Sequence, residues 1–314
     1  MVVRRESGTI QHLSISDLPD LLCSNDRLIL NNTKVVPARL FQNAESQWQI
    51  TGQTRGKLTA GESITLIPAA ESDKALDEIS LTSPNQRLVL KEKQADGTWL
   101  VEPDPAGSSA EILEAFGTLP LPPYIGRKVA DQSDQDRYQT VYASKEGAIA
   151  APTAGLHFTD ELLGKCRSKG VQTTDVTLHV GIGTFRPVNA DRLSDHQMHS
   201  EWCEVPASAF AEIQATKQAD GNIVCVGTTS VRTLEAAALC TTTDHWAGDT
   251  ELFIQPGFQF RLVDQLLTNF HLPGSTLIVL VAALAGYELT MEAYAKAVEE
   301  KYRFYSYGDA MLIL

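Results

Sequence analysis

The chain has 314 residues, of which 43% are hydrophobic and 21% are charged. This composition is ordinary for a globular protein, and the length is sufficient for one large or two modest domains. The formal net charge of −13 argues against a general nucleic-acid binder, because contacts with phosphates need Lys and Arg side chains on one face. An RNA partner would need a local basic patch, and the candidates for it are Arg137, Arg167, Lys169, Lys301 and Arg303.

Neither a membrane span nor a secretory signal is predicted. The longest apolar stretch, 277–286, is about half as long as a helix that crosses a bilayer. The N-terminal residues MVVRRESGTI lack an apolar signal-peptide core, so we predict a cytoplasmic protein. The five cysteines are scattered without a CxxC pair, which favours reduced thiols over a disulfide framework or a zinc ribbon.

The first part of the chain predicts a short helix at 15–23, a buried strand at 27–30 and a turn at 31–33. After residue 40, short alternating apolar runs such as SITLIP, ISLTS, RLVLKE and TWLVEP recur between Gly, Pro, Asn and Asp residues. That pattern is typical of a small sandwich or barrel. We therefore predict an all-β, barrel-like domain at 41–117, inserted into an α/β domain formed by 1–40 and 118–314.

From residue 117 onward, helical and strand patterns alternate. Thr159 predicts a helix N-cap followed by acids in the first turn, and Gly170 predicts the end of that helix. A strand is predicted at 176–180, a helix that begins at Pro206 and ends at Gly221 comes next, and a buried strand follows at 223–226. This alternation indicates an α/β architecture, which we predict to contain a mixed sheet.

The segment NIVCVGTTSVRTLEAAA, which begins at 222, combines a buried strand, a short turn and a helix. Free backbone N–H groups at such a helix start, beside hydroxyls and an arginine, suit a carboxylate or a phosphate. Thr228, Thr229, Ser230 and Arg232 are therefore candidate substrate-binding residues. An ordinary strand-to-helix connection with hydroxyl caps explains the same pattern equally well.

The segment VTLHVGIGTFRPV, at 176–188, mimics the glycine-rich loop of an S-adenosylmethionine methyltransferase, because a strand leads into Gly181 and Gly183. The match fails in detail: His179 stands where an acid is usual, Phe185 replaces the third glycine, and Pro187 opposes a helix there. A methyltransferase remains the alternative enzyme class. A lone imidazole within a strand is more often a hydrogen-bonded core residue than a catalyst.

Further histidines lie in three other segments. His196, His199 and Glu201 could form a metal cluster, but their spacing is unlike that of zinc enzymes, so we predict no metal and regard these groups as acid–base candidates. The loops AAPTAGLHFT (150–159) and LLTNFHLPGSTL (266–277) place His157 and His271 beside aromatic residues. Small residues in such loops allow a ligand to approach the backbone closely. The tail KYRFYSYGDAM, at 301–311, could stack nucleobases or pack the final helix.

Ten segments carry a resemblance to known proteins. They are NNTKVVPARL (31–40), LPLPPYI (119–125), RYQTVYA (137–143), GAIAAPTAGLHF (147–158), VTLHVGIGTFRPV (176–188), HQMHSEWCEV (196–205), VGTTSVRTLE (226–235), FIQPGFQFRLVD (253–264), TNFHLPGSTL (268–277) and EKYRFYSYGDAM (300–311). In this order they closely resemble the S-adenosylmethionine:tRNA ribosyltransferase-isomerases of queuosine biosynthesis. Members of that family usually carry a further N-terminal segment, and they usually have Tyr where this chain has Gln255.

The resemblance implies a tRNA-modifying transferase. Such an enzyme transfers and isomerises the ribosyl part of S-adenosylmethionine onto 7-aminomethyl-7-deazaguanine at the wobble position of tRNA. Epoxyqueuosine forms, and adenine and methionine leave. The implied partners are S-adenosylmethionine, as a substrate, and tRNA, with no further cofactor and no membrane, and we predict a monomer.

The reaction needs acid–base groups, an anchor for a carboxylate, hydrogen bonds to a ribose and a stacking surface. The predicted catalytic residues are His157, His179, His199, Glu201 and His271. The predicted substrate-binding residues are Thr153, Gly155, Gly181, Gly183, Phe185, Thr228, Thr229, Ser230, Arg232 and Asn269. We expect the four histidines to converge on one pocket. A non-enzymatic RNA-binding module built on the β insert is the second alternative, and it leaves the histidine-containing loops unexplained.

Overall fold

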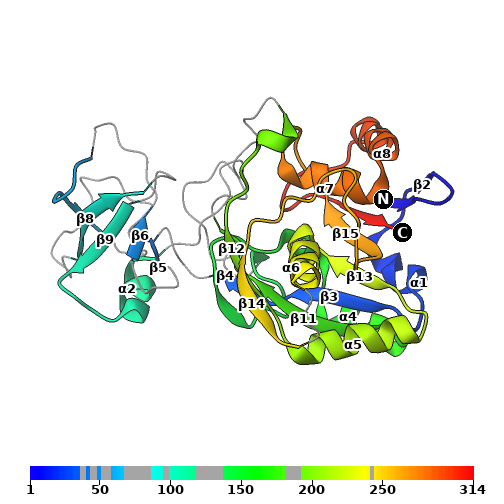
Figure 1. The fold of residues 1–314 in the computed structure, drawn as a ribbon, viewed down its shortest axis with the longest axis horizontal. Helices are drawn as coiled ribbons and strands as arrows, with labels where there is room; N and C mark the ends of the chain where they lie inside the picture. The colour runs from blue at the N-terminus through cyan, green and yellow to red at the C-terminus, as the bar shows by residue number, and fades with distance from the viewer. Residues whose placement is uncertain are drawn as a thin grey trace. The chain divides into compact units, whose positions relative to one another are not determined.

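The computed structural model describes residues 1–35, 40–42, 48–50, 58–66, 86–94, 99–117, 137–181, 192–240 and 244–314. The chain folds into two compact units (Figure 1). The larger unit joins Met1–Lys34 to Arg137–Leu314, and the smaller unit is Val35–Asp136. The insert predicted at 41–117 falls within the smaller unit, whose bounds are wider at both ends.

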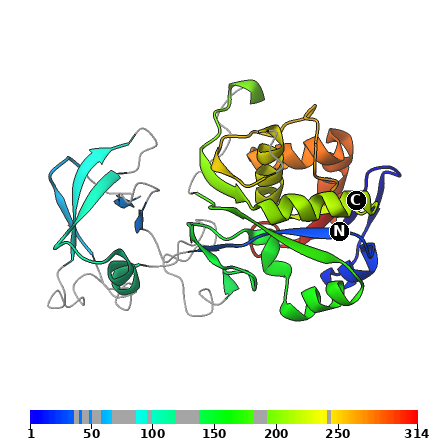
Figure 2. The same ribbon diagram turned by 60° about the horizontal axis from the view of Figure 1, so that its bottom comes forward.

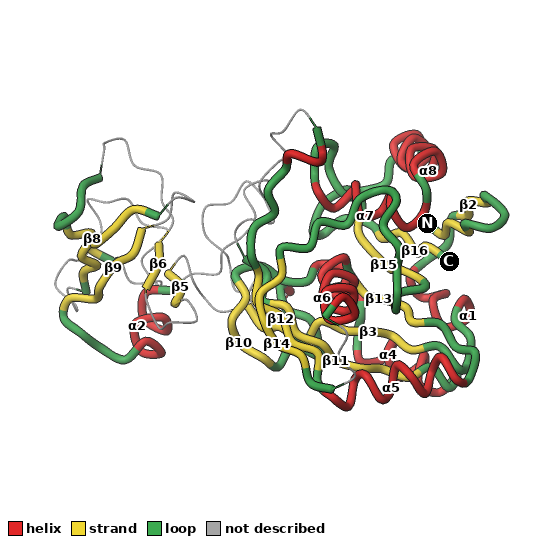
Figure 3. Tube along the Cα trace, viewed as in Figure 1, coloured by secondary structure: helices red, strands yellow, loops and turns green. Residues whose placement is uncertain are grey.

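In the described residues, one mixed sheet dominates the larger unit (Figure 3). Its strands follow the order β14 (Trp246–Thr250), β12 (Glu201–Val205), β11 (Gln172–Leu178), β3 (Arg27–Asn31), β13 (Ile223–Val226), β15 (Gln265–Asn269), β16 (Ala310–Ile313), β1 (Val2–Arg4) and β2 (Thr9–Gln11). Strands β11, β3, β13 and β15 are parallel, whereas β12 and β16 on either side are antiparallel to them. The prediction of an α/β architecture with a mixed sheet is therefore confirmed.

Helices cover both faces of this sheet (Figure 2). Successive side chains of β3 point to opposite faces of the sheet, and both faces are apolar: Leu28 and Leu30 pack on one side and Ile29 packs on the other. The first side holds α1 (Leu18–Leu21) and α4 (Asp160–Ser168), and the second holds α5 (Ala207–Gln218), α6 (Thr228–Leu239), α7 (Thr276–Ala285) and α8 (Tyr287–Glu299). A strand that is buried on both faces is apolar at nearly every position, which explains the continuous apolar runs in the sequence.

The helix ends follow the local signals in the sequence. The Thr159 hydroxyl accepts a hydrogen bond from the Leu162 N–H at 3.1 Å, so it caps α4 as predicted. Gly170, with a φ of +92°, ends the same helix. The predicted helix at 15–23 is present as two shorter pieces, η1 (Ile15–Asp17) and α1. The turn predicted at 31–33 is wrong, because Asn31 ends β3 and only one residue separates it from the start of β4 (Thr33–Val35).

The smaller unit contains a five-stranded antiparallel sheet with the order β5 (Leu40–Gln42), β6 (Trp48–Ile50), β9 (Trp99–Asp104), β8 (Arg87–Lys93) and β7 (Ser63–Thr65). It also contains a helix, α2 (Ser109–Phe116), so the prediction of an all-β domain is wrong at this point. Ile112 and Phe116, four residues apart, form one helical face that packs with the sheet residues Leu88 and Leu90. In the described residues, β5 and β7 are the two edges of this sheet, and closure into a barrel stays a prediction.

Within the described part of the chain, no single helix has the length and hydropathy of a membrane span. In the same residues, α7 and α8 have that length and hydropathy when they are taken together, but the two helices meet at a bend of 118°.

Candidate active site

The predicted site residues that the structure describes gather at one edge of the large sheet. The parallel strands β3, β11, β13 and β15 end there, and the carboxyl ends of such strands are the usual place for a ligand. Asn31 ends β3, His179 follows β11, Gly227 follows β13, and Asn269 ends β15. Glu201, the first residue of the antiparallel β12, reaches the same edge. A short 3-10 helix, η4 (Thr153–His157), packs beside β15 and brings a further predicted histidine to this edge.

Glu201 is the most deeply buried acid of the candidate site, with an exposed fraction of 3%. One carboxylate oxygen, Oε1, accepts the Gly181 backbone N–H at 2.9 Å. The other, Oε2, pairs with the Arg232 guanidinium and lies 3.1 Å from His199 Nε2. The His199 contact has the distance of an ion pair, without the alignment of a hydrogen bond. A buried carboxylate needs such partners to offset its loss of hydration.

These partners decide the ionisation of Glu201. Burial alone would raise the pKa of its carboxyl group, but His199, the Arg232 guanidinium and the Gly181 N–H together lower that pKa to about 2. Glu201 is therefore ionised throughout the neutral range. So acidic a group accepts a proton poorly, and the geometry favours it as an anchor for His199 and for the segment that begins at Gly181.

Each of the three guanidinium nitrogens of Arg232 has a hydrogen-bond partner within the protein. Besides Glu201, its Nε donates to the Leu252 carbonyl at 3.1 Å and its Nη2 donates to the Thr250 carbonyl at 3.4 Å. The residue is only 5% exposed. Its binding of a substrate anion stays a prediction, whereas the contacts that the structure contains support a role in holding Glu201.

Gly227 connects β13 to α6, so the predicted order of strand, short turn and helix is present. Gly227 adopts a φ of +88°, a conformation in which a side chain would be strained. The Ser230 hydroxyl donates to the Val226 carbonyl at 2.8 Å, so it serves the helix itself. The Thr229 hydroxyl accepts from Asn31 Nδ2 at 3.2 Å, and Thr228 is buried at the helix start. The Ser230 hydroxyl therefore stabilises the helix start, and the Thr229 hydroxyl connects it to β3.

Asn31 joins three elements at the sheet edge, a role that was absent from the predicted site. Its amide Nδ2 donates to the Leu178 carbonyl at 3.0 Å and to Thr229, while its Oδ1 accepts the Leu178 N–H at 3.0 Å and the Thr33 N–H at 3.2 Å. All four hydrogen bonds are satisfied although the side chain is fully buried. Two asparagines directly after a buried apolar strand were the signal in the sequence.

His179 is held by residues from three segments. Its Nδ1 lies 2.8 Å from the Thr33 hydroxyl, and its ring stacks on Trp202 with a centroid distance of 5.0 Å. The edge of the ring packs against Gly147, where an added Cβ atom would lie 2.7 Å from Nε2. Burial, assisted by the Lys145 charge, lowers the pKa of His179, so its imidazole is neutral at pH 7. Thr33, Trp202 and Gly147 were also absent from the predicted site.

His157, at the end of η4, and Asn269, at the end of β15, are neighbours. Asn269 Nδ2 lies 3.2 Å from His157 Nε2, and its Oδ1 accepts from the Thr153 hydroxyl at 3.1 Å. Burial lowers the pKa of His157. Gly155 has a packing function here, because a Cβ atom at this position would clash with the Tyr142 hydroxyl.

His271 lies at the end of the same edge, just after β15. Its Nε2 is 2.8 Å from the Thr268 hydroxyl, and its backbone N–H donates to the Tyr294 hydroxyl at 3.0 Å. Desolvation lowers the pKa of its imidazole to about 4. The group is therefore neutral at physiological pH.

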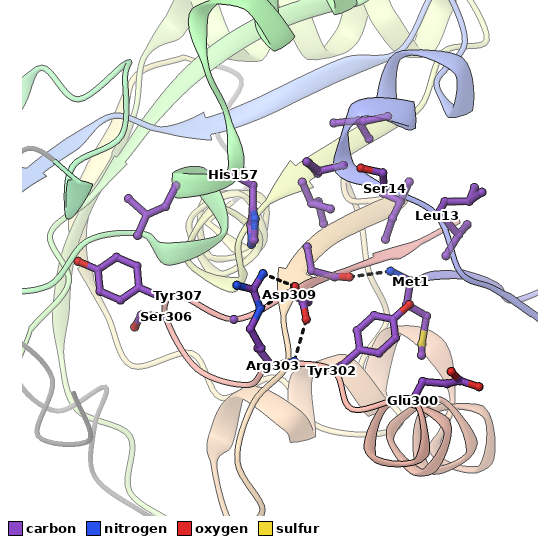
Figure 4. Close-up of a pocket in the computed structure, with 18 of the residues that line it drawn as sticks. Met1, Leu13, Ser14, His157, Glu300, Tyr302, Arg303, Ser306, Tyr307 and Asp309 are labelled. Atoms are coloured by element: carbon purple, nitrogen blue, oxygen red, sulfur yellow. Dashed lines mark hydrogen bonds and ion pairs between the residues drawn. The ribbon is translucent and has the colours of Figure 1, made fainter. Parts of the chain in front are cut away.

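A cavity of about 590 Å³ opens beside His157 (Figure 4). It is lined by the loop before α1, by α1 itself and by the C-terminal tail, and in Figure 4 His157 lies above the Arg303–Asp309 pair. Among the described lining residues, His157 is the only member of the predicted site. His179, His199 and His271 reach the same sheet edge with separate partners, so their convergence with His157 on one pocket stays a prediction. Gly183 and Phe185 lie outside the described residues.

No three His, Cys, Asp or Glu side chains come together as a metal site in the described ranges. His199 and Glu201 are neighbours, whereas His196 lies edge-on to Phe253, with 5.3 Å between the ring centroids.

Comparisons with known proteins cover nearly the whole chain. A family model described as queuosine biosynthesis protein matches residues 1–313. An S-adenosylmethionine:tRNA ribosyltransferase-isomerase of Coxiella burnetii (strain RSA 331 / Henzerling II) is 45% identical, over 100% of this chain and 90% of that protein. The crystal structure of an S-adenosylmethionine tRNA ribosyltransferase from Thermotoga maritima is similar, with a TM-score of 0.56, 33% identity and coverage of 100% of this chain and 91% of that one. With the family model matched from the first strand to the last, the chain belongs to the queuosine biosynthesis protein family.

Proposed function

We propose that this chain is an S-adenosylmethionine:tRNA ribosyltransferase-isomerase. The observation that carries the proposal is the family match over residues 1–313, together with 45% identity to the Coxiella burnetii enzyme across the full chain. The enzyme transfers and isomerises the ribosyl moiety of S-adenosylmethionine onto 7-aminomethyl-7-deazaguanine at the wobble position of tRNA. The products are epoxyqueuosine in the tRNA, free adenine and free methionine.

The chemistry of the substrate defines the groups that the protein must supply. The sulfonium acidifies the neighbouring 5′ carbon of the ribose, so a positioned base can remove a proton there, and an acid must protonate the departing adenine. An imidazole that is neutral in the resting enzyme can do the first and, once protonated, the second. Burial keeps His157 and His179 neutral at pH 7, which supports them as the candidates for these two steps.

The remaining predicted residues have supporting roles in this proposal. Glu201 orients His199 and holds Gly181, and Arg232 fixes Glu201 in turn. Asn269 holds the His157 ring. The other hydroxyl and glycine positions at the sheet edge, with Gly183 and Phe185, surround S-adenosylmethionine. The proposed reaction uses S-adenosylmethionine as a substrate with no metal or further cofactor, in a cytoplasmic monomer whose smaller unit closes as a barrel.

Product analysis tests this function. The purified chain is incubated with S-adenosylmethionine and tRNA that carries 7-aminomethyl-7-deazaguanine, and the nucleosides and small molecules are identified by mass spectrometry. We expect epoxyqueuosine, adenine and methionine in equal amounts. S-adenosylhomocysteine with a methylated nucleoside would identify a methyltransferase instead, and tRNA binding without turnover of S-adenosylmethionine would identify an RNA-binding module.

A further inference from the structure

The cavity beside His157 collects positive charge in a chain whose net charge is −13. Arg137, Lys301 and Arg303 all line it, although Arg137 is far from the other two in the sequence. The two other basic candidates, Arg167 at the end of α4 and Lys169 just after it, do not line it. The fold therefore separates the five candidate cations into a group of three at the cavity and a group of two at the C-terminal end of α4.

The cations of the cavity differ in how they are engaged. Arg303 is held by Asp309, whose Oδ1 accepts from Nη2 at 2.7 Å and from Nε at 3.2 Å. This pair largely cancels its own charge. Arg137 and Lys301 have no ion pair in the described part of the chain, and Glu300 is the remaining acid in the lining. The positive charges of Arg137 and Lys301 are therefore available at the cavity to bind an anion.

Aromatic rings accompany these cations. Tyr302 and Tyr307 line the cavity, and the Tyr302 hydroxyl is fixed by a 2.8 Å hydrogen bond to His12 Nδ1. The Arg137 guanidinium carbon lies 6.0 Å from the centroid of the Tyr307 ring. Cations interleaved with aromatic rings are the surface that unpaired RNA nucleotides bind, because the phosphate is attracted and the base stacks. A cavity of 590 Å³ also falls in the size range of small-ligand sites.

We propose that this cavity binds an unpaired nucleotide of the RNA substrate. Arg137 and Lys301 contact its phosphate, and its base packs against the rings of Tyr302 and Tyr307. The proposal rests on the proposed function, since that function makes tRNA the substrate. Because His157 borders the cavity, the bound nucleotide lies next to a candidate catalytic group, as a neighbour of the modified base would.

The test is RNA binding by the full chain at several salt concentrations. Fluorescence anisotropy with a labelled tRNA anticodon stem-loop is measured for the wild type, for Arg137→Gln/Lys301→Gln, and for the matched control Arg167→Gln/Lys169→Gln. Each contact with a phosphate of unpaired RNA adds about 0.7 to the slope of log affinity against log salt. If each of the two residues makes such a contact, the cavity variant should lose affinity about tenfold and its slope should fall by about 1.4. The control should keep the wild-type slope, and the KM for S-adenosylmethionine should be unchanged in both variants.

The possible results separate cleanly. Wild-type affinity and slope in the cavity variant would overturn the proposal, as would an equal loss in the control. Weaker binding of S-adenosylmethionine, with RNA binding intact, would mean that the cavity holds the carboxylate of that substrate and would also overturn it. A wild type that binds RNA but releases no adenine would refute the proposed function and leave the binding test valid. Should the double variant unfold, Lys301→Gln alone repeats the test on an exposed turn, with an expected slope change of about 0.7.

Discussion

Replacement of Glu201 by Gln removes the charge that the buried Arg232 guanidinium needs. The two side chains are 1% and 6% exposed, so the arginine would be left as an uncompensated buried cation. Loss of one partner from such a pair costs about 3–5 kcal/mol of folding free energy. The pKa of Glu201, which is lowered from 4.5 to about 2, leads independently to about 3 kcal/mol, at 1.36 kcal/mol per pKa unit.

The difference in unfolding free energy between wild type and Glu201→Gln should depend on pH, and its sign follows from the pKa of Glu201. A carboxyl group whose pKa is lower in the folded state stabilises the fold above its unfolded pKa, and this stabilisation is lost as the pH falls through the folded pKa. For Glu201 the window runs from 4.5 down to about 2. The gap in unfolding free energy between wild type and Glu201→Gln should therefore shrink by about 2 kcal/mol from pH 7 to pH 3.

Equilibrium urea unfolding, followed by tryptophan fluorescence at pH 7 and pH 3, measures both quantities. The double variant Glu201→Gln/Arg232→Met is the control, because it removes both buried charges and should recover part of the loss. A loss below about 1 kcal/mol at pH 7, or a gap that does not change with pH, would refute the assignment of Glu201 and Arg232 as a buried charge pair.

Three further predictions concern the histidines. Thr33→Val removes the hydroxyl beside His179 and should lower kcat about tenfold, with little change in the KM for S-adenosylmethionine. Thr33→Ser keeps a hydroxyl and should restore turnover. Equal effects of both variants would contradict a role of this hydroxyl in orienting the His179 ring. Gly147→Ala forces a side chain onto a φ of +147° and against the His179 ring, and should cost about 1–3 kcal/mol of stability by thermal unfolding; an unchanged midpoint would count against that contact. The imidazole of His271 should stay neutral down to a pH of about 4, so its NMR resonances should not shift between pH 8 and pH 5. A titration near pH 6.5 would show that the ring is hydrated and would contradict this prediction.

Local signals in the sequence were sufficient for some elements of the larger unit, such as β3, α4, α5 and β13. The cap at Thr159 and the stop at Gly170 predicted a helix that the structure contains, because these signals depend on one turn of backbone. The buried strands were readable for a similar reason, since a strand covered on both faces is apolar throughout. The order of the motifs also indicated the family, because ten matched segments depend on no tertiary information.

The same local reasoning missed α2 and the connection after β3. The turn expected at 31–33 ignored the partners of Asn31, which lie more than a hundred residues away on β11 and α6. Polar residues after a strand resemble a turn in the sequence, and only the adjacent strand shows that their hydrogen bonds are made across the sheet.

Tertiary structure decided the partners of the candidate site residues. The sequence predicted Arg232 as an anion-binding group without showing its partners in the protein. In the structure, its guanidinium contacts Glu201 and the carbonyl groups of Thr250 and Leu252. Likewise, the five basic candidates were equivalent until the fold placed three of them around one cavity. A sequence specifies the donors and acceptors that a residue carries, but burial and pairing depend on residues that are distant along the chain. The pKa of Glu201, the orientation of His179 and the charge of the cavity therefore follow from the packing of the sheet edge.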